Sequence, residues 1–109
     1  MDSLFVYGTL APGKPNHHHL AMVKGEWYKA VITGHLVEQG WGAEMGYPGI
    51  IPCETGDRVQ GYLLCAGSLT EHWERLDKFE GEGYERVQVQ AELENGAKIS
   101  AFVYAVKKA

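Results

Sequence analysis

Two carboxylates in the run Leu76-Asp77-Lys78-Phe79-Glu80-Gly81 are the side chains of this sequence best suited to proton transfer. Asp77 and Glu80 lie three positions apart, so on a helix they occupy neighbouring positions of one face. A carboxyl group shielded by Phe79 has a raised pKa and can act as both acid and base. The alternative is that both are solvated charges at a helix end. A glutamate there opposes the helix dipole, a local cost that hints at a functional reason for Glu80.

The run Tyr7-Gly8-Thr9-Leu10 is a second candidate, for binding a ligand rather than for proton transfer. It places a glycine where a strand pattern gives way to a loop. Backbone N–H groups beside a glycine can approach a ligand without obstruction by a side chain. Taken alone, the same tetrapeptide is better explained as an ordinary glycine at the end of a strand.

The remaining residues that could bind a metal or act as nucleophiles do not form a recognisable site. His17, His18 and His19 are adjacent, and on a helix their side chains would point about 100° apart, so they cannot converge on one ion. Cys53 and Cys65 lack a CxxC spacing and are interpreted as small buried or edge hydrophobic residues. The glycine-rich residues 40–49 match no nucleotide-binding motif. We therefore expect no metal and no cofactor.

Two helices are predicted. Asn16 is expected to cap a short helix over residues 17–23, with Leu20 and Val23 facing inward. Residues 68–71 match a capping box, which predicts that the second helix begins there. Along this helix an apolar stripe recurs at spacings of four, three and three residues before Gly81 and Gly83 end it; its members are Leu69, Trp73, Leu76 and Phe79. Glu80 then falls at the C-terminal edge.

Strands are expected over residues 4–7, 27–36, 58–65, 87–93 and 99–106. Asn95-Gly96 predicts a hairpin between the last two. The last strand is apolar on both faces, so it is expected to be central rather than at an edge. Residues 39–52 carry four glycines and two prolines and are predicted to form an irregular loop.

Length and composition limit the class of protein. A chain of 109 residues, 45% hydrophobic and 22% charged, fits one globular domain over residues 1–109. The formal net charge of -4 offers no basic surface for nucleic acid. No stretch approaches the roughly 20 apolar residues of a membrane helix, and no signal peptide is evident. We expect a cytoplasmic protein of the α+β class, with a curled or barrel-like sheet.

Five segments in order resemble the γ-glutamylcyclotransferase-like family, especially its γ-glutamylamine cyclotransferase branch. They are Leu4-Phe5-Val6-Tyr7-Gly8-Thr9-Leu10 with Gly13-Lys14-Pro15-Asn16-His17, then Tyr47-Pro48-Gly49, Val59-Gln60-Gly61-Tyr62, Leu76-Asp77-Lys78-Phe79-Glu80-Gly81, and Tyr84-Glu85-Arg86. The resemblance covers nearly the whole chain. It implies a small mixed β-barrel with short flanking helices.

The resemblance also implies the roles of individual residues. Glu80 stands where the family has its acid/base. The turn Tyr7-Gly8-Thr9-Leu10 stands where the family binds the glutamyl group through its backbone, with Tyr7 as a wall. Tyr84 is placed to donate a hydrogen bond within the pocket.

The implied function is release of 5-oxoproline and a free amine from a γ-glutamyl compound, with γ-glutamylamines favoured over glutathione. The substrate supplies its own nucleophile, the α-amine, so neither metal nor activated water is needed. The alternative is a non-catalytic ligand-binding or interaction domain that keeps the same fold. The expected partner is a small-molecule γ-glutamyl substrate. Neither a nucleic acid nor a membrane is expected as a partner. The oligomeric state and the leaving amine are left open.

Overall fold

The computed structural model describes residues 2–8, 10–38 and 49–107 of the chain. Its sheet follows the order β3-β2-β4-β1-β6-β5. The strands are β1 (Asp2–Val6), β2 (Glu26–Val37), β3 (Gly49–Pro52), β4 (Asp57–Ala66), β5 (Tyr84–Leu93) and β6 (Lys98–Val106). The β5–β6 hairpin is confirmed, and its register pairs Arg86 with Tyr104.

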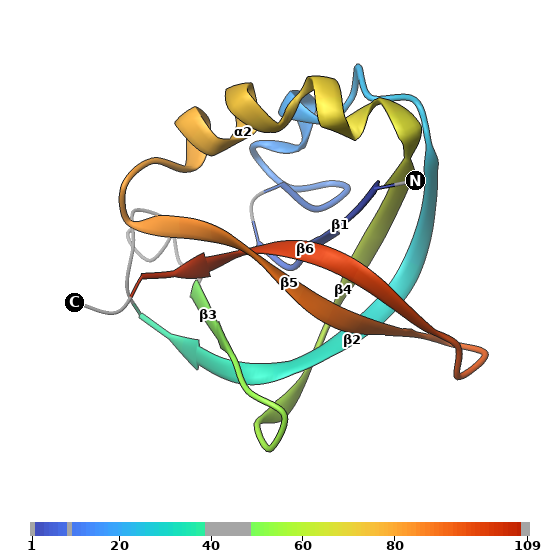
Figure 1. The fold of residues 1–109 in the computed structure, drawn as a ribbon, viewed down its shortest axis with the longest axis vertical. Helices are drawn as coiled ribbons and strands as arrows, with labels where there is room; N and C mark the ends of the chain where they lie inside the picture. The colour runs from blue at the N-terminus through green and yellow to red at the C-terminus, as the bar shows by residue number, and fades with distance from the viewer. Residues whose placement is uncertain (1, 9, 39–48, 108–109) are drawn as a thin grey trace.

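The sheet closes into a barrel because β2 also pairs with β5, at Ala30–Leu93 and Val31–Glu92. The closed set is β2, β4, β1, β6 and β5, and β1 and β6 run parallel while the other pairs are antiparallel. Strand β6 lies between β1 and β5, so the prediction of a central last strand is confirmed. The expected α+β class with a small mixed barrel is confirmed as well (Figure 1).

The prediction of an irregular loop over residues 39–52 is wrong for its last four residues. β3 pairs with the C-terminal end of β2, with Leu36 opposite Ile50, and Ile50 is fully buried. The reason is non-local: these residues become a strand by pairing with β2, which local sequence does not reveal. Residues 39–48 lie outside the described part of the chain.

Two cores follow from the alternation of side chains along the strands. One fills the barrel and includes Phe5 and Val103. The other lies between the barrel wall and the helix α2 (Trp73–Glu80), and includes Leu4 and Leu76. In Figure 1, α2 lies across the outside of the barrel, above β1 and β6.

The predicted stripe on this helix is confirmed, because Leu69, Trp73 and Leu76 are buried and Phe79 is half-buried. The predicted capping box is wrong. Ala66 leaves β4 in an extended conformation and a 3₁₀ helix, Gly67–Glu71, follows it at once without a side-chain cap. His72 N–H bonds the Leu69 carbonyl at 2.9 Å, and α2 begins only after this turn.

The expected helix over residues 17–23 is also wrong in type. Only His17–His19 forms a 3₁₀ helix, and the Asn16 side chain makes no cap hydrogen bond. Successive tight turns continue through Leu20 N–H to His17 O (2.8 Å) and Val23 N–H to Leu20 O (3.0 Å). Leu20 and Val23 nevertheless face inward and are buried, as predicted.

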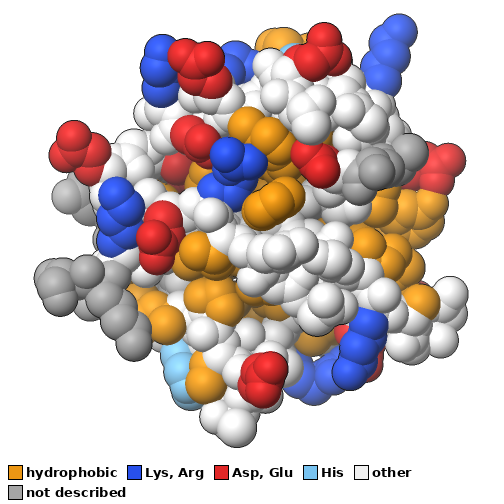
Figure 2. Space-filling model, viewed as in Figure 1, with side chains coloured by type: hydrophobic (Ala, Val, Ile, Leu, Met, Phe, Trp, Pro, Cys, Tyr) orange, Lys and Arg blue, Asp and Glu red, His pale blue; other side chains and the backbone are white. Residues whose placement is uncertain are grey.

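Surface charge is mixed in sign. On the face shown in Figure 2, acidic and basic side chains are interspersed among apolar ones. No helix among the described residues has the length and apolarity needed to cross a bilayer.

We predict that Gly61→Ala destabilises the barrel. A Cβ at Gly61 would lie 2.4 Å from the Val6 carbonyl oxygen and 2.7 Å from the Phe5 ring. Overpacking of this kind costs about 1–3 kcal/mol of the free energy of unfolding. The matched control is Gly67→Ala, where a Cβ meets no atom within 4 Å. Urea denaturation of both variants measures the difference, and equal stabilities would contradict the packing account.

Candidate active site

Glu80 is the last residue of α2, and the chain turns sharply behind it. Gly81 follows with φ 82° and ψ -172°, a conformation essentially restricted to glycine. Gly81 N–H bonds the Asp77 carbonyl at 3.0 Å, and Tyr84 N–H bonds the Gly81 carbonyl at 3.3 Å. This turn fixes Glu80 at the helix end, as the sequence predicted, and brings Tyr84 into β5 directly after it.

Burial dominates the electrostatics of Glu80. Its side chain is half-buried, and desolvation of the charged form raises the pKa of the carboxyl to about 7. The expected upward shift is therefore confirmed in direction and cause. A carboxyl group with a pKa near neutrality can accept and return a proton at modest cost, which is what a single acid/base residue requires.

Tyr7 lies at the mouth of the barrel, and its hydroxyl group is bound to backbone. The hydroxyl donates to the Tyr104 carbonyl at 2.9 Å and accepts from the Ile50 N–H at 3.0 Å. Burial raises the pKa of Tyr7, and the nearby charge of Glu80 acts in the same direction. Tyr7 is thus a fixed wall next to the candidate acid/base, with its ring stacked on Phe5 at 6.3 Å between centroids.

The predicted substrate-binding turn follows directly after Tyr7. Ala11 N–H bonds the Gly8 carbonyl at 3.1 Å, and Leu10 is buried. Thr9 lies outside the described residues. The sequence did not predict a contact between His17 and this turn. His17 Nδ1 lies 3.0 Å from the Leu10 carbonyl and connects the turn to the 3₁₀ helix.

The histidine run contacts the site from another side as well. The His19 ring packs on Phe79, the neighbour of Glu80, with 3.9 Å between ring centroids. Among the described residues, no group of three or more His, Cys, Asp or Glu side chains is placed to hold a metal ion. Cys53 and Cys65 are free thiols at half-buried positions.

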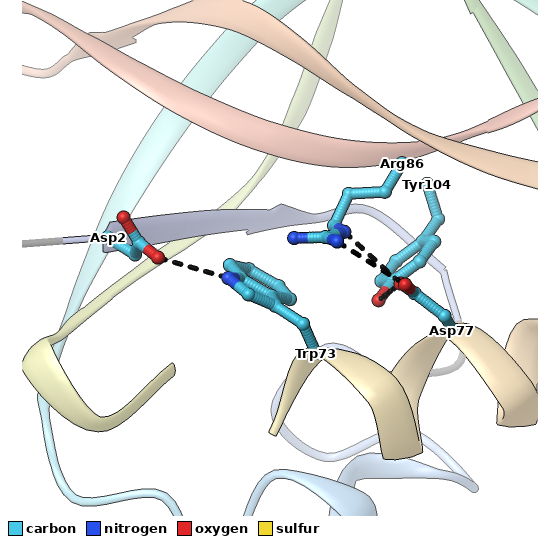
Figure 3. A network of polar contacts seen from close by, with 5 residues as sticks. All are labelled: Asp2, Trp73, Asp77, Arg86 and Tyr104. Atoms are coloured by element: carbon cyan, nitrogen blue, oxygen red, sulfur yellow. Dashed lines mark hydrogen bonds and ion pairs between the residues drawn. The ribbon is translucent and has the colours of Figure 1, made fainter. Parts of the chain in front are cut away.

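Asp77, the second predicted carboxylate, has structural partners that sequence reasoning did not identify. Tyr104 donates its hydroxyl to Asp77 Oδ1 at 2.6 Å, and Arg86 Nη2 donates to Oδ2 at 3.3 Å (Figure 3). Arg86 Nε lies 3.2 Å from Oδ1, an ion-pair contact without hydrogen-bond alignment. Both carboxylate oxygens of Asp77 are therefore engaged by side chains of β5 and β6.

The register of the β5–β6 hairpin brings these partners together. It is centred on Asn95 and places Arg86 opposite Tyr104, whereas the predicted two-residue turn at Asn95-Gly96 would have placed Arg86 opposite Ala105. Arg86 and Tyr84 then share one face of β5, because they are two residues apart. Both residues belong to the Tyr84-Glu85-Arg86 segment of the family resemblance, which assigned a role to Tyr84 but none to Arg86.

Comparison with known proteins identifies a family. The sequence profile of the family described as "Gamma-glutamyl cyclotransferase, AIG2-like" matches residues 4–109. A protein of Niallia circulans named gamma-L-glutamyl-butirosin B gamma-glutamyl cyclotransferase is 29% identical over 110 residues, which is 95% of this chain and 67% of that protein.

Solved structures agree with this match. YkqA of Bacillus subtilis superposes with a TM-score of 0.74 at 29% identity, over 97% of this chain but only 36% of its own. An AIG2-like protein of Mus musculus superposes with a TM-score of 0.73 at 28% identity, over 100% of this chain and 79% of its own. The chain thus spans about two thirds of the Niallia protein and about a third of YkqA.

The raised pKa of Glu80 predicts how stability depends on pH. The folded value of about 7 lies above the ordinary value of 4.5, so the folded state binds the proton more tightly and loses stability as pH rises between these two values. Glu80→Gln, which carries no charge, should therefore raise Tm at pH 8 and leave it nearly unchanged at pH 4. Glu82→Gln, an exposed position two residues away, is the control and should shift Tm equally at both pH values. A Glu80→Gln effect independent of pH would contradict the burial account.

Proposed function

The chain belongs to the gamma-glutamyl cyclotransferase, AIG2-like family, and from this premise we propose that it releases 5-oxoproline and a free amine from a γ-glutamyl compound. The observation that most supports the proposal is the position of Glu80. A half-buried carboxyl with a pKa of about 7 lies beside the wall residue that leads into the turn of residues 7–10.

The proposed reaction is an intramolecular transfer. The α-amine of the glutamyl group attacks its own γ-carbonyl carbon, a C–N bond forms, and the bond to the leaving amine breaks. In becoming the lactam N–H, the α-nitrogen loses two protons. Glu80 accepts each in turn, returns the first to the departing nitrogen and passes the second to the released amine, so the amine leaves as an ammonium and Glu80 ends ionised as it began. Holding the substrate bent into the attack geometry supplies much of the rate, because both reacting groups belong to one molecule.

Binding of the glutamyl end is assigned to the turn after β1. Backbone N–H groups of residues 8–10, Thr9 included, would bind the α-carboxylate, and Tyr84 would donate a hydrogen bond within the same pocket. Support for this comes from the geometry next to Thr9: Tyr7 is held by two backbone hydrogen bonds and Leu10 by His17. A turn anchored on both sides is preorganised for a ligand.

The substrate proposed is a γ-glutamylamine. The preference comes from the form of the Tyr7-Gly8-Thr9-Leu10 segment and from Pro15-Asn16-His17. The Niallia circulans protein is named for γ-L-glutamyl-butirosin B. No metal or cofactor enters the proposed reaction, since the nucleophile comes from the substrate.

A substrate panel tests the reaction. The protein is incubated with γ-glutamylamines, γ-glutamyl amino acids and glutathione, and 5-oxoproline is measured by mass spectrometry. We expect release from at least one γ-glutamylamine, and a loss of about 10²–10⁴-fold in Glu80→Gln. Glu82→Gln should retain the wild-type rate. Binding without 5-oxoproline formation would instead favour a non-catalytic ligand-binding domain, and a near-normal rate for Glu80→Gln would remove Glu80 from the mechanism.

The pH profile tests the role of Glu80 independently of the substrate. Glu80 must be ionised to accept a proton, so kcat/KM should rise with pH on a limb near 7, where the free enzyme titrates. The substrate ammonium titrates at about 8 and must be measured separately. In the complex this ammonium favours the carboxylate, so the limb in kcat should lie at lower pH. A limb at the ordinary glutamate value of about 4.3 would contradict the assignment.

A further inference from the structure

Tyr104 makes one hydrogen bond to helix α2 and one to Tyr7, the residue that follows β1. Its hydroxyl group donates to Asp77 on α2 at 2.6 Å. Its backbone carbonyl accepts from the Tyr7 hydroxyl at 2.9 Å, and that hydroxyl also accepts from Ile50 N–H of β3. One residue of β6 therefore connects α2, β1 and, through Tyr7, β3.

Asp77 is held at a defined orientation by these contacts. Arg86 of β5 contacts both of its carboxylate oxygens, at 3.2 and 3.3 Å. The guanidinium group is itself placed over two aromatic rings, 4.4 Å from the centre of the Trp73 ring and 5.3 Å from that of Phe102. Figure 3 shows Arg86 and Tyr104 reaching Asp77 from the strands that face the helix. The last turn of α2 is thus attached to two neighbouring strands.

Glu80 depends on that attachment. It lies three residues beyond Asp77 in the same final turn, and the last helical hydrogen bond, from Gly81 N–H, ends on the Asp77 carbonyl. A displacement of Asp77 moves the Glu80 carboxyl with it. Tyr7, on the other side, begins the turn to which the glutamyl end is assigned.

We propose that Tyr104 is a positioning residue that holds Glu80 at a fixed separation from the turn of residues 7–10, through its hydroxyl bond to Asp77 and its carbonyl bond to Tyr7. This inference rests on the function proposed above. A catalytic carboxylate and a substrate held on different elements need such a link, since a displacement of about 1 Å can cost on the order of a hundredfold in rate.

The charged and titratable groups around Glu80 determine what a variant can change. Within the described residues, the hydroxyl groups of Tyr7 and Tyr104 interact electrostatically with it. Asp77 and Lys78 lie on its own helix, and His19 packs over Phe79. Burial and the bond to Asp77 raise the pKa of Tyr104, so its hydroxyl is neutral at working pH and removing it changes no net charge.

Tyr104→Phe is the direct test, because it deletes the bond to Asp77 and keeps the bond from Tyr7 to the backbone. We expect kcat to fall roughly tenfold with KM little changed, since the substrate-binding turn is intact. The loosened helix end should expose Glu80 and lower its pKa toward the ordinary value, measured by NMR titration of the Glu80 side-chain carboxyl.

The matched control acts at the opposite end of the same helix. Trp73 Nε1 donates to Asp2 Oδ2 at 3.0 Å, and Asp2→Ala removes that bond. It should leave both kcat and the Glu80 pKa as in the wild type. Equal effects of Asp2→Ala and Tyr104→Phe would show general destabilisation and overturn the proposal.

A double-mutant cycle supplies a second test. Asp77→Ala also removes the contacts with Arg86 and should cost at least as much as Tyr104→Phe. Asp77→Asn should retain more activity because its amide oxygen still accepts from Tyr104, and the double variant Asp77→Ala/Tyr104→Phe should be no worse than Asp77→Ala alone. Additive losses would overturn the proposal, as would an unchanged Glu80 pKa in Tyr104→Phe. If the wild type releases no 5-oxoproline, the proposed function fails, but the NMR titration still decides whether Tyr104 positions Glu80.

Discussion

Side-chain alternation along β1 and β6 is the constraint on which the rest of this structure depends. Because successive residues of a strand face opposite sides, each strand supplies two different cores. On β6, Val103 points into the barrel while Tyr104 points to the layer beneath α2. On β1, Leu4 packs under the helix while Phe5 lies in the barrel. A shift of one residue in either strand would exchange the two sets and disrupt both cores at once.

The candidate site lies where these two cores meet. Tyr7 continues the barrel-facing positions of β1, and Glu80 ends the helix that covers the outer face. Tyr104 belongs to the outer layer, yet its carbonyl reaches the hydroxyl of Tyr7. A carboxyl placed at this junction loses much of its hydration, and this desolvation raises its pKa to near neutrality. Such a group lowers the stability of the folded state at neutral pH, a cost commonly found where a residue is retained for function.

The site is also assembled from segments that are far apart in the sequence. The pair Asp77–Tyr104 spans 27 positions and the pair Tyr7–Tyr104 spans 97. The parallel pairing of β1 with β6 makes the longer contact possible, because it places the first and last strands side by side in the barrel wall. The short turn from Glu80 to Tyr84 then connects the covering helix to β5, the partner of β6 in the hairpin.

The sequence alone was sufficient for those features that depend on local chemistry. The Asn95-Gly96 turn, the apolar stripe ending at Phe79 and the helix stop at Gly81 each follow from residues within one or two turns of each other. The five ordered segments that resemble the family predicted the barrel and the candidate role of Glu80 as well. The tertiary structure decided the remainder: β3, the 3₁₀ turn before α2, the anchoring of Tyr7, and the engagement of Asp77 by Arg86 and Tyr104. Apart from the 3₁₀ turn, whose hydrogen bond is local, these could not be predicted because a hydrogen bond between residues far apart in the sequence exists only once strand register has brought its two partners together.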